Sequence, residues 1–173
     1  MIRALIFDLD QTLIESRHIE NLRRMRNWQA VYQEIPTIQA YNGVNDLLSI
    51  AEDNGIKLAI VTSSPEPYVQ RVVDHFNWAF DAKVCYHDTK QHKPNLAPFV
   101  EALNRLTLKA VDCWAIGDDS RDIIAAKAAG MYSVGALWGS ANKQGLIEAE
   151  PDILFESVAS LSKAIRNSID SLF

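Results

Sequence analysis

The sequence predicts an α/β protein, a three-layer, doubly wound parallel sheet of the Rossmann-like type with a minimal helical cap insertion. Three observations predict it. Short apolar runs alternate with segments of helical period, which is typical of a parallel sheet covered by helices. Polar residues directly follow several of these runs, and the alternation is interrupted once, between Leu13 and Gly43. With 173 residues, the chain has the size of a single domain.

The apolar runs have the length of buried strands. The first, Ala4 to Phe7, lies close to the N-terminus. Later runs cover Lys57 to Val61, Lys83 to Tyr86, Val111 to Ile116 and Ser133 to Leu137, with a short edge strand expected around Ile153 to Phe155. The sequence therefore predicts five or six strands.

The segments between these runs predict helices. Val44, Leu47, Leu48 and Ala51 keep the i, i+3, i+4, i+7 spacing of a helix with one apolar face, and Gly55 follows where a left-handed C-terminal cap belongs. Further helices are expected to open at Pro65 and Pro94 and end near Phe76 and Leu106, to run from Asp119 or Ser120 to Gly130, and to begin near Ser157.

About thirty residues between Leu13 and Gly43 contain no strand-like run. No repeat and no Gly/Ser linker marks a domain boundary anywhere in the chain. We therefore expect one domain over residues 1–173 with a small helical insertion at about 14–40. The apolar residues of the insertion recur at helical spacing and are Ile19, Leu22, Met25, Trp28, Val31, Tyr32 and Ile35.

Composition and charge exclude several classes of protein. Seventeen Lys and Arg against 22 Asp and Glu give a net charge of −5, which opposes sequence-independent binding to nucleic acid or to an anionic membrane. Cys85 and Cys113 lie in apolar runs without metal-ligand spacing, so we expect them to be reduced and buried. No signal-peptide pattern and no apolar run near the roughly 18 residues of a membrane span is present, and a cytoplasmic location is expected.

The residues that follow the expected strands carry the chemistry. The carboxyl ends of parallel strands open on one edge of the sheet, where ligands bind. Carboxylates gathered there repel one another by several kcal/mol and need a cation, for which oxygen ligands favour Mg²⁺. A hydroxyl and an ammonium group beside them suit the oxygens of a phosphate ester. The residues are Asp8, Asp10, Thr62, Ser63, Lys93, Asp118, Asp119 and Asp122.

In order and context, these residues resemble the four motifs of the haloacid dehalogenase-like (HAD) superfamily. The resembling segments are Asp8-Leu9-Asp10-Gln11-Thr12, Val61-Thr62-Ser63, Lys93-Pro94 and Gly117-Asp118-Asp119-Ser120-Arg121-Asp122. Each motif alone is weakly specific, whereas the four together are specific. Similarity to the phosphoglycolate-phosphatase-like branch extends from Tyr41 almost to the C-terminus.

The resemblance implies a Mg²⁺-dependent phosphomonoester hydrolase. Asp8 would attack phosphorus and form an aspartyl phosphate, and Asp10 would act as general acid and then as base. Asp10 also argues against dehalogenation, because the dehalogenases of the family lack this second carboxylate. Mg²⁺ would be bound by Asp8, the backbone carbonyl of Asp10 and Asp118, with Asp122 as a further ligand or a support, while Thr62, Ser63 and Lys93 would hold the phosphoryl group.

Two departures from the branch are visible. Gln11 replaces the glycine that is common after the second aspartate, which makes the local turn less permissive. The insertion has room for one helix or a short hairpin, whereas relatives carry a cap of some seventy residues that chooses the substrate. We expect a phosphorylated small molecule, and no partner among nucleic acids or membranes. The open site implies either a large or exposed phosphate substrate or a second copy of the chain as cover.

Several residues have simpler interpretations. Thr62 and Ser63 could cap the helix that begins at Pro65, and Asp119 is better explained as a helix cap than as a metal ligand. The histidines show no metal-ligand spacing and are expected on the surface or at helix ends, and the tryptophans are expected to fill the core or an interface. These residues are His18, His75, His87 and His92, and Trp28, Trp78, Trp114 and Trp138.

The insertion is locally basic. Residues 17 to 28 contain four arginines and one glutamate, which gives a local charge of +3. These residues are Arg17, Arg23, Arg24, Arg26 and Glu20. These arginines could form a solvated helix face, attract an anionic substrate or contact an acidic partner. An alternative function is accordingly a non-catalytic or regulatory HAD-like protein that binds a partner through the 14–35 helix, although Asp8 and Asp10 together favour an enzyme. A receiver-like domain is disfavoured because its aspartate and lysine follow other strands.

Overall fold

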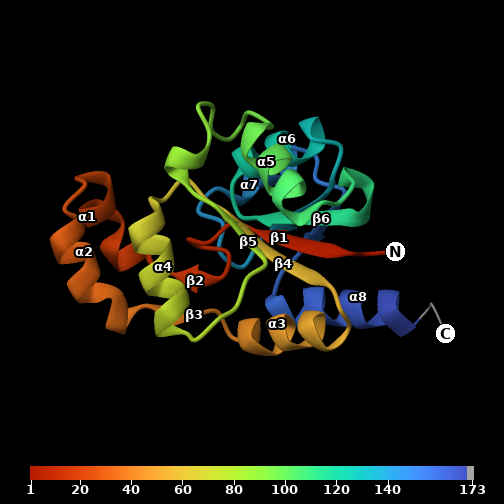
Figure 1. Ribbon diagram of the computed structural model, residues 1–173, viewed down its shortest axis with the longest axis horizontal. Coiled ribbons are helices and arrows are strands. Elements are labelled where there is room, and N and C mark those ends of the chain that lie inside the picture. The colour runs from red at the N-terminus through yellow and green to blue at the C-terminus, as the bar shows by residue number, and fades with distance from the viewer. Residues whose placement is uncertain (171–173) are drawn as a thin grey trace.

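The computed structural model describes residues 1–170 and is built on a six-stranded parallel sheet (Figure 1). The strand order is β5-β4-β1-β6-β7-β8, so the chain reverses its direction of travel across the sheet at the central strand β1. The strands are β1 (Ala4–Phe7), β4 (Lys57–Val61), β5 (Ala82–Val84), β6 (Cys113–Gly117), β7 (Tyr132–Ala136) and β8 (Ile153–Phe155). This confirms the doubly wound α/β fold.

Two strand boundaries differ by two residues from those expected, and several others differ by one. β5 ends at Val84 because Tyr86–Asp88 turns into a 3-10 helix, and β6 begins at Cys113 because Ala110–Asp112 forms another. Both corrected segments are apolar in part, so the sequence pattern alone could not separate them from the strands.

Helices cover both faces of the sheet (Figure 1). One buried cluster joins alternate residues of β1 and β4 to the helices of one face, a second joins the opposite residues to two helices of the other face, and a third, smaller cluster includes the remaining helix of that face. The first face carries α3 (Val44–Asp53), α4 (Glu66–His75) and α8 (Val158–Asp170), and the second carries α5 (Ala97–Leu106), α6 (Ser120–Ala128) and α7 (Lys143–Glu148). The expectation that Pro94 opens a helix was wrong, since α5 begins at Ala97. The short helix α7 was not predicted.

The segment at about 14–40 projects beside α4, at the left of Figure 1. It leaves and re-enters the core through a two-stranded antiparallel ribbon, β2 (Ile14–Glu15) and β3 (Gln39–Ala40). Between them lie α1 (Glu20–Arg24) and α2 (Trp28–Glu34), flanked by 3-10 turns at Arg17–Ile19 and Ile35–Thr37. The chain breaks between the helices at Arg26, which has a positive φ of 54°. Buried Ile19 and Val31 anchor the segment to the main core.

Both cysteines are buried free thiols, as expected. Burial raises the pKa of each thiol, of Cys85 and of Cys113, to about 11. None of the helices between residues 1 and 170 is both long enough and apolar enough to cross a membrane.

Candidate active site

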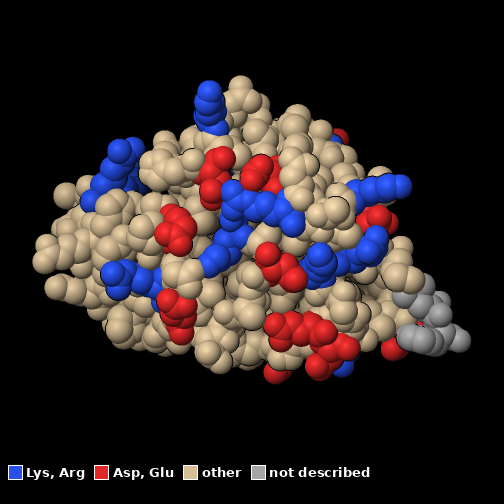
Figure 2. All heavy atoms as spheres, in the orientation of Figure 1, with Lys and Arg blue, Asp and Glu red and all other residues tan. Residues whose placement is uncertain are grey.

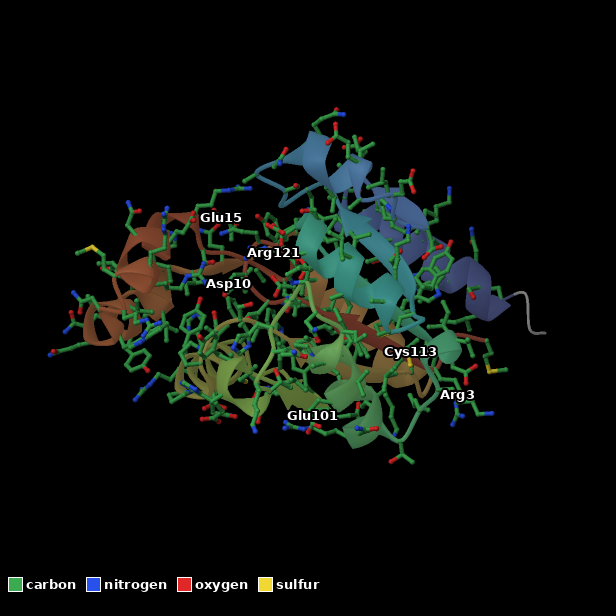
Figure 3. All side chains as sticks on the ribbon, turned by 90° about the horizontal axis from the view of Figure 1, so that it is seen from above. Arg3, Asp10, Glu15, Glu101, Cys113 and Arg121 are labelled. Carbon is green, nitrogen blue, oxygen red and sulfur yellow. The ribbon has the colours of Figure 1, made fainter. Side chains whose placement is uncertain are left out.

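A cleft of about 580 Å³ opens at the carboxyl edge of the sheet, between the core and the insertion. Figure 3 views the molecule from above and labels Asp10 and Arg121, which both line this cleft. All the residues that the sequence assigned to the site line it: Asp8, Asp10, Thr62, Ser63, Lys93, Asp118, Asp119 and Asp122. The parallel sheet thus brings together side chains from four separate stretches of chain.

Three carboxylates converge at the base of the cleft. Asp8 follows β1, Asp118 follows β6, and Asp122 lies in the first turn of α6; one carboxylate oxygen of each lies within 4.8 Å of those of the others. Gly117 permits this approach, because a Cβ at that position would lie 2.4 Å from the Asp122 side chain. The Thr12 hydroxyl donates a hydrogen bond to Asp118 over 3.0 Å and fixes its orientation.

Lys93 is the counter-charge of this cluster. Its Nζ lies 2.8 Å from Asp8 Oδ1 and 2.6 Å from Asp122 Oδ1, and it donates a hydrogen bond to the carbonyl of Val61 over 3.0 Å. The three N–H groups of the ammonium therefore each have an acceptor. Burial opposes the charge on Lys93, but Asp122 and Asp8 outweigh burial and raise its pKa.

The three carboxylates of the cluster outnumber the single ammonium, and the pKa values of two of them are raised. Burial raises the pKa of Asp8 to about 7, against the lowering effect of Lys93. Burial, together with the charges of Asp8 and Asp122, raises the pKa of Asp118 to about 8. A group of buried carboxylates that resists ionisation at neutral pH is suited to a divalent cation, and an all-oxygen donor set suits Mg²⁺. The residues present therefore fit the expected metal.

Asp10 lies apart from this cluster and is held by four side chains. Its carboxylate accepts hydrogen bonds from Ser16 (2.7 Å), Ser64 (2.9 Å) and Tyr68 (2.8 Å), and it forms an ion pair with Arg23. The carboxylate of Asp10 is accordingly no member of the cluster formed by the other three aspartates. Its expected role as a metal ligand through the backbone carbonyl stays a prediction.

The second motif combines one buried and one exposed hydroxyl residue. Thr62 is buried and its Oγ1 accepts a hydrogen bond from the Ser64 backbone N–H over 3.1 Å, while Ser63 is exposed and lines the cleft. Neither caps α4, whose N-cap is Pro65 without a side-chain hydrogen bond, so the capping interpretation was wrong. Asp119 does cap α6, in a reciprocal capping box with Asp122, as expected.

Comparison with known proteins gives the family. The family model described as "Haloacid dehalogenase-like hydrolase" matches residues 16–136. The chain belongs to this family. It is 40% identical to a phosphoglycolate phosphatase of Xanthomonas campestris over 103 residues (58% of this chain, 47% of the relative), and 34% identical to one of Xylella fastidiosa over 134 residues (76% and 56%). The chain thus spans about half the length of these curated relatives. The fold matches that of a hydrolase from Pseudomonas syringae, with a TM-score of 0.82, 20% identity and coverage of 95% and 98%.

The segment with Asp8 and Asp10, which resembles the first HAD motif, precedes the matched stretch, and its loop is fixed by contacts of its own. Gln11, where the branch commonly has glycine, adopts a positive φ of 67°. The Tyr41 hydroxyl donates to its side chain over 3.1 Å, and Trp138 Nε1 donates to the carbonyl of Thr12 over 3.0 Å. A Cβ at Gly139 would collide with the Gln11 carbonyl, at 1.5 Å. The loop after β7 therefore packs directly against this motif.

The four arginines of the insertion all line the cleft, together with Glu20. Figure 2 shows basic and acidic side chains interspersed on one face of the molecule rather than a single basic surface. Trp28 also lines the cleft, which the sequence did not predict, while Trp78 and Trp114 stack on Phe76 and Tyr132. Among the histidines, His75 ends α4 as expected, and exposed His87 reaches the cleft.

The raised carboxyl pKa values predict a pH-dependent stability. Asp8 and Asp118 titrate near 7 and 8 in the folded protein and near 3.8 when unfolded, so the folded protein binds more protons between about pH 4 and pH 8. Their contribution to the free energy of unfolding therefore falls as the pH rises through this window. Saturating Mg²⁺, at about 100 times its Kd, is expected to add about 2.7 kcal/mol, or roughly 5–10 °C in Tm, near pH 8 and much less near pH 5. Thermal unfolding with and without Mg²⁺ at both pH values measures this, and equal shifts would contradict it.

Proposed function

We propose that this protein is a Mg²⁺-dependent phosphomonoester hydrolase that works through an aspartyl-phosphate intermediate. The observation that carries the proposal is the placement of Asp8 within 2.8 Å of Lys93 and in one cluster with the carboxylates of Asp118 and Asp122, with Asp10 at the same cleft. Membership of the HAD hydrolase family supports it.

The chemistry assigns different tasks to the two aspartates of the first motif. Asp8 Oδ attacks phosphorus, the bond from phosphorus to the ester oxygen breaks, and Asp10 gives its proton to the departing oxygen. A water molecule then attacks the aspartyl phosphate, with Asp10 taking the proton back. The two aspartates have separate environments: Asp8 is held beside Lys93, whereas Asp10 contacts three hydroxyl groups and Arg23.

Asp8, Asp118, Asp122 and the backbone carbonyl of Asp10 would hold Mg²⁺, and the ion, when bound, would supply positive charge to the phosphoryl oxygens. Thr62, Ser63 and Lys93 would bind the same oxygens. The ammonium of Lys93 already has three acceptors, so its main contribution is to orient Asp8 and offset its charge.

The segment at about 14–40 would act as a minimal cap of a single domain, with its helices over the cleft. The substrate would be a phosphorylated small molecule, and phosphoglycolate belongs among the candidates because relatives that are named for it match part of the chain. A second copy of the chain could complete the cover of the cleft.

Hydrolysis of p-nitrophenyl phosphate, a generic aryl phosphate, tests the reaction without knowledge of the natural substrate. Turnover is expected with Mg²⁺, is expected to stop after exhaustive chelation, and should return when Mg²⁺ is added back. Turnover that survives chelation would contradict the metal assignment. A protein that turns over neither this ester nor any member of a panel of sugar, nucleotide and short-acid phosphates would instead fit the alternative of a partner-binding protein.

A further inference from the structure

Arg23 of α1 is the charged residue of the insertion that contacts Asp10. Its Nη1 forms the ion pair with Asp10 Oδ2 and lies 3.4 Å from Ser64 Oγ, while its guanidinium lies 5.7 Å from the centre of the Tyr68 ring. Only 16% of its side chain is exposed. Burial disfavours its charge, but Asp10, Tyr68, Asp8 and Glu20 together outweigh burial and raise the pKa of Arg23. The side chain is therefore a fixed cation at the cleft wall.

The guanidinium of Arg23 has an N–H donor without an acceptor. Its Nε is buried and has no hydrogen-bond partner, which is costly for a charged group. A planar guanidinium offers five N–H donors and binds carboxylate or phosphate best in a two-bond fork. Asp10 takes only one of its terminal nitrogens. An anion that accepted two bonds would satisfy Arg23 better than Asp10 does.

Asp10, in contrast, does not depend on Arg23. Without it, the carboxylate would still accept hydrogen bonds from Ser16, Ser64 and Tyr68. An exchange in which Arg23 leaves Asp10 for another anion therefore leaves no buried carboxylate without a partner. The ion pair with Asp10 is replaceable in a way that the pair between Lys93 and Asp8 is not.

Most of the acidic residues of the cleft lie on its sheet side and most of its arginines on the insertion side, with Arg121 and Glu20 as the exceptions. The carboxylate cluster and Lys93 lie on the sheet side, where the proposed function places the transferred phosphoryl group. Arg17, Arg24 and Arg26 line the cleft together with Arg23 on the insertion side. Since Asp10 protonates the ester oxygen in that function, an anion bound by Arg23 would belong to the leaving group, close to that oxygen.

We propose that Arg23 is a specificity-determining residue, which exchanges Asp10 for an anionic group on the leaving group of the substrate. Preferred substrates are phosphate esters whose leaving group carries a carboxylate or a second phosphate one or two carbons from the ester oxygen. This inference rests on the proposed function. It assigns Arg23 a contact with the substrate and leaves the acid–base role with Asp10.

Matched esters test the proposal. 2-Phosphoglycolate carries a carboxylate, ethylene glycol bisphosphate carries a second phosphate, and 2-hydroxyethyl phosphate is a neutral ester of similar size. Replacing Arg23→Gln is expected to lower kcat/KM for whichever anionic ester the wild type prefers by about 30-fold or more, and that for the neutral ester by less than about threefold. Arg23→Lys should recover only part of the loss, because it lacks the fork.

Controls separate the inference from the proposed function. Arg166→Gln, an exposed charge change on α8, is expected to leave all three rates unchanged. Calorimetry in an Asp8→Asn background gives the affinity for each ester without turnover, and Arg23→Gln should weaken only the anionic ones. Equal losses for charged and neutral esters would overturn the inference and make the pair with Asp10 structural. Wild-type protein that hydrolyses none of the esters would count against the proposed function, while the calorimetric comparison would still decide the role of Arg23.

Discussion

Replacing Asp8 by asparagine is expected to lower kcat/KM by about 10⁴-fold or more for every phosphate ester that the wild-type protein hydrolyses. An amide oxygen is a far weaker nucleophile than a carboxylate, and an aspartyl phosphate cannot form on it. Steady-state kinetics with an aryl phosphate and with the preferred ester would measure the loss.

The fold should survive this replacement. Burial raises the pKa of Asp8 to about 7, so its neutral form already coexists with the charged form near neutral pH. Lys93 would keep Asp122 and the carbonyl of Val61 as acceptors. Asp46→Asn on the exposed face of α3 provides a charge-matched control, with unchanged activity expected. Turnover by Asp8→Asn within tenfold of the wild type would exclude Asp8 as the nucleophile.

Most of the fold could be predicted because buried strands and helices have simple apolar patterns in the sequence. The central strand β1 is buried on both faces and is continuously apolar, and the helix α3 shows one apolar face. Elements of two residues, such as β2 and β3, are too short to show such a pattern. The boundaries of β5 and β6 were missed because adjoining 3-10 turns share their apolar composition.

The candidate site likewise contains some residues whose position could be predicted from the sequence and others whose position could not. Strand-end residues such as Asp8 and Asp118 could be predicted to meet, because parallel strands end on one edge of a sheet. The side chains that contact Asp10 could not be predicted. Arg23 reaches Asp10 only through the packing of the insertion on α4, and Tyr68 does so from within α4. Ser64, which donates to Asp10, directly follows Ser63, and nothing in the sequence favours one of these two serines over the other.

Lys93→Met is expected to cause the largest loss of stability among the substitutions considered. Methionine keeps the approximate length of the lysine but removes its charge, so the carboxylates of Asp8 and Asp122 lose the ammonium that lies within 2.8 Å of both. Removing one partner of a buried ion pair typically costs about 3–5 kcal/mol, which corresponds to a fall in Tm of roughly 10 °C for a chain of this size. Lys163→Met, an exposed change on α8, should leave Tm unchanged.

The pH dependence of this loss identifies its cause. The pKa of Lys93 is raised above 10.5, so its favourable contribution is present throughout the neutral range and does not itself vary there. Without it, the folded-state pKa values of Asp8 and Asp118, which Lys93 lowers, rise further above their unfolded values, and the folded variant binds still more protons than the unfolded chain. The deficit should therefore be small near pH 5, where the carboxylates can be protonated, and full near pH 8. A deficit of equal size at both pH values would mean that the variant suffers from altered packing, and the counter-charge role assigned to Lys93 would then be wrong.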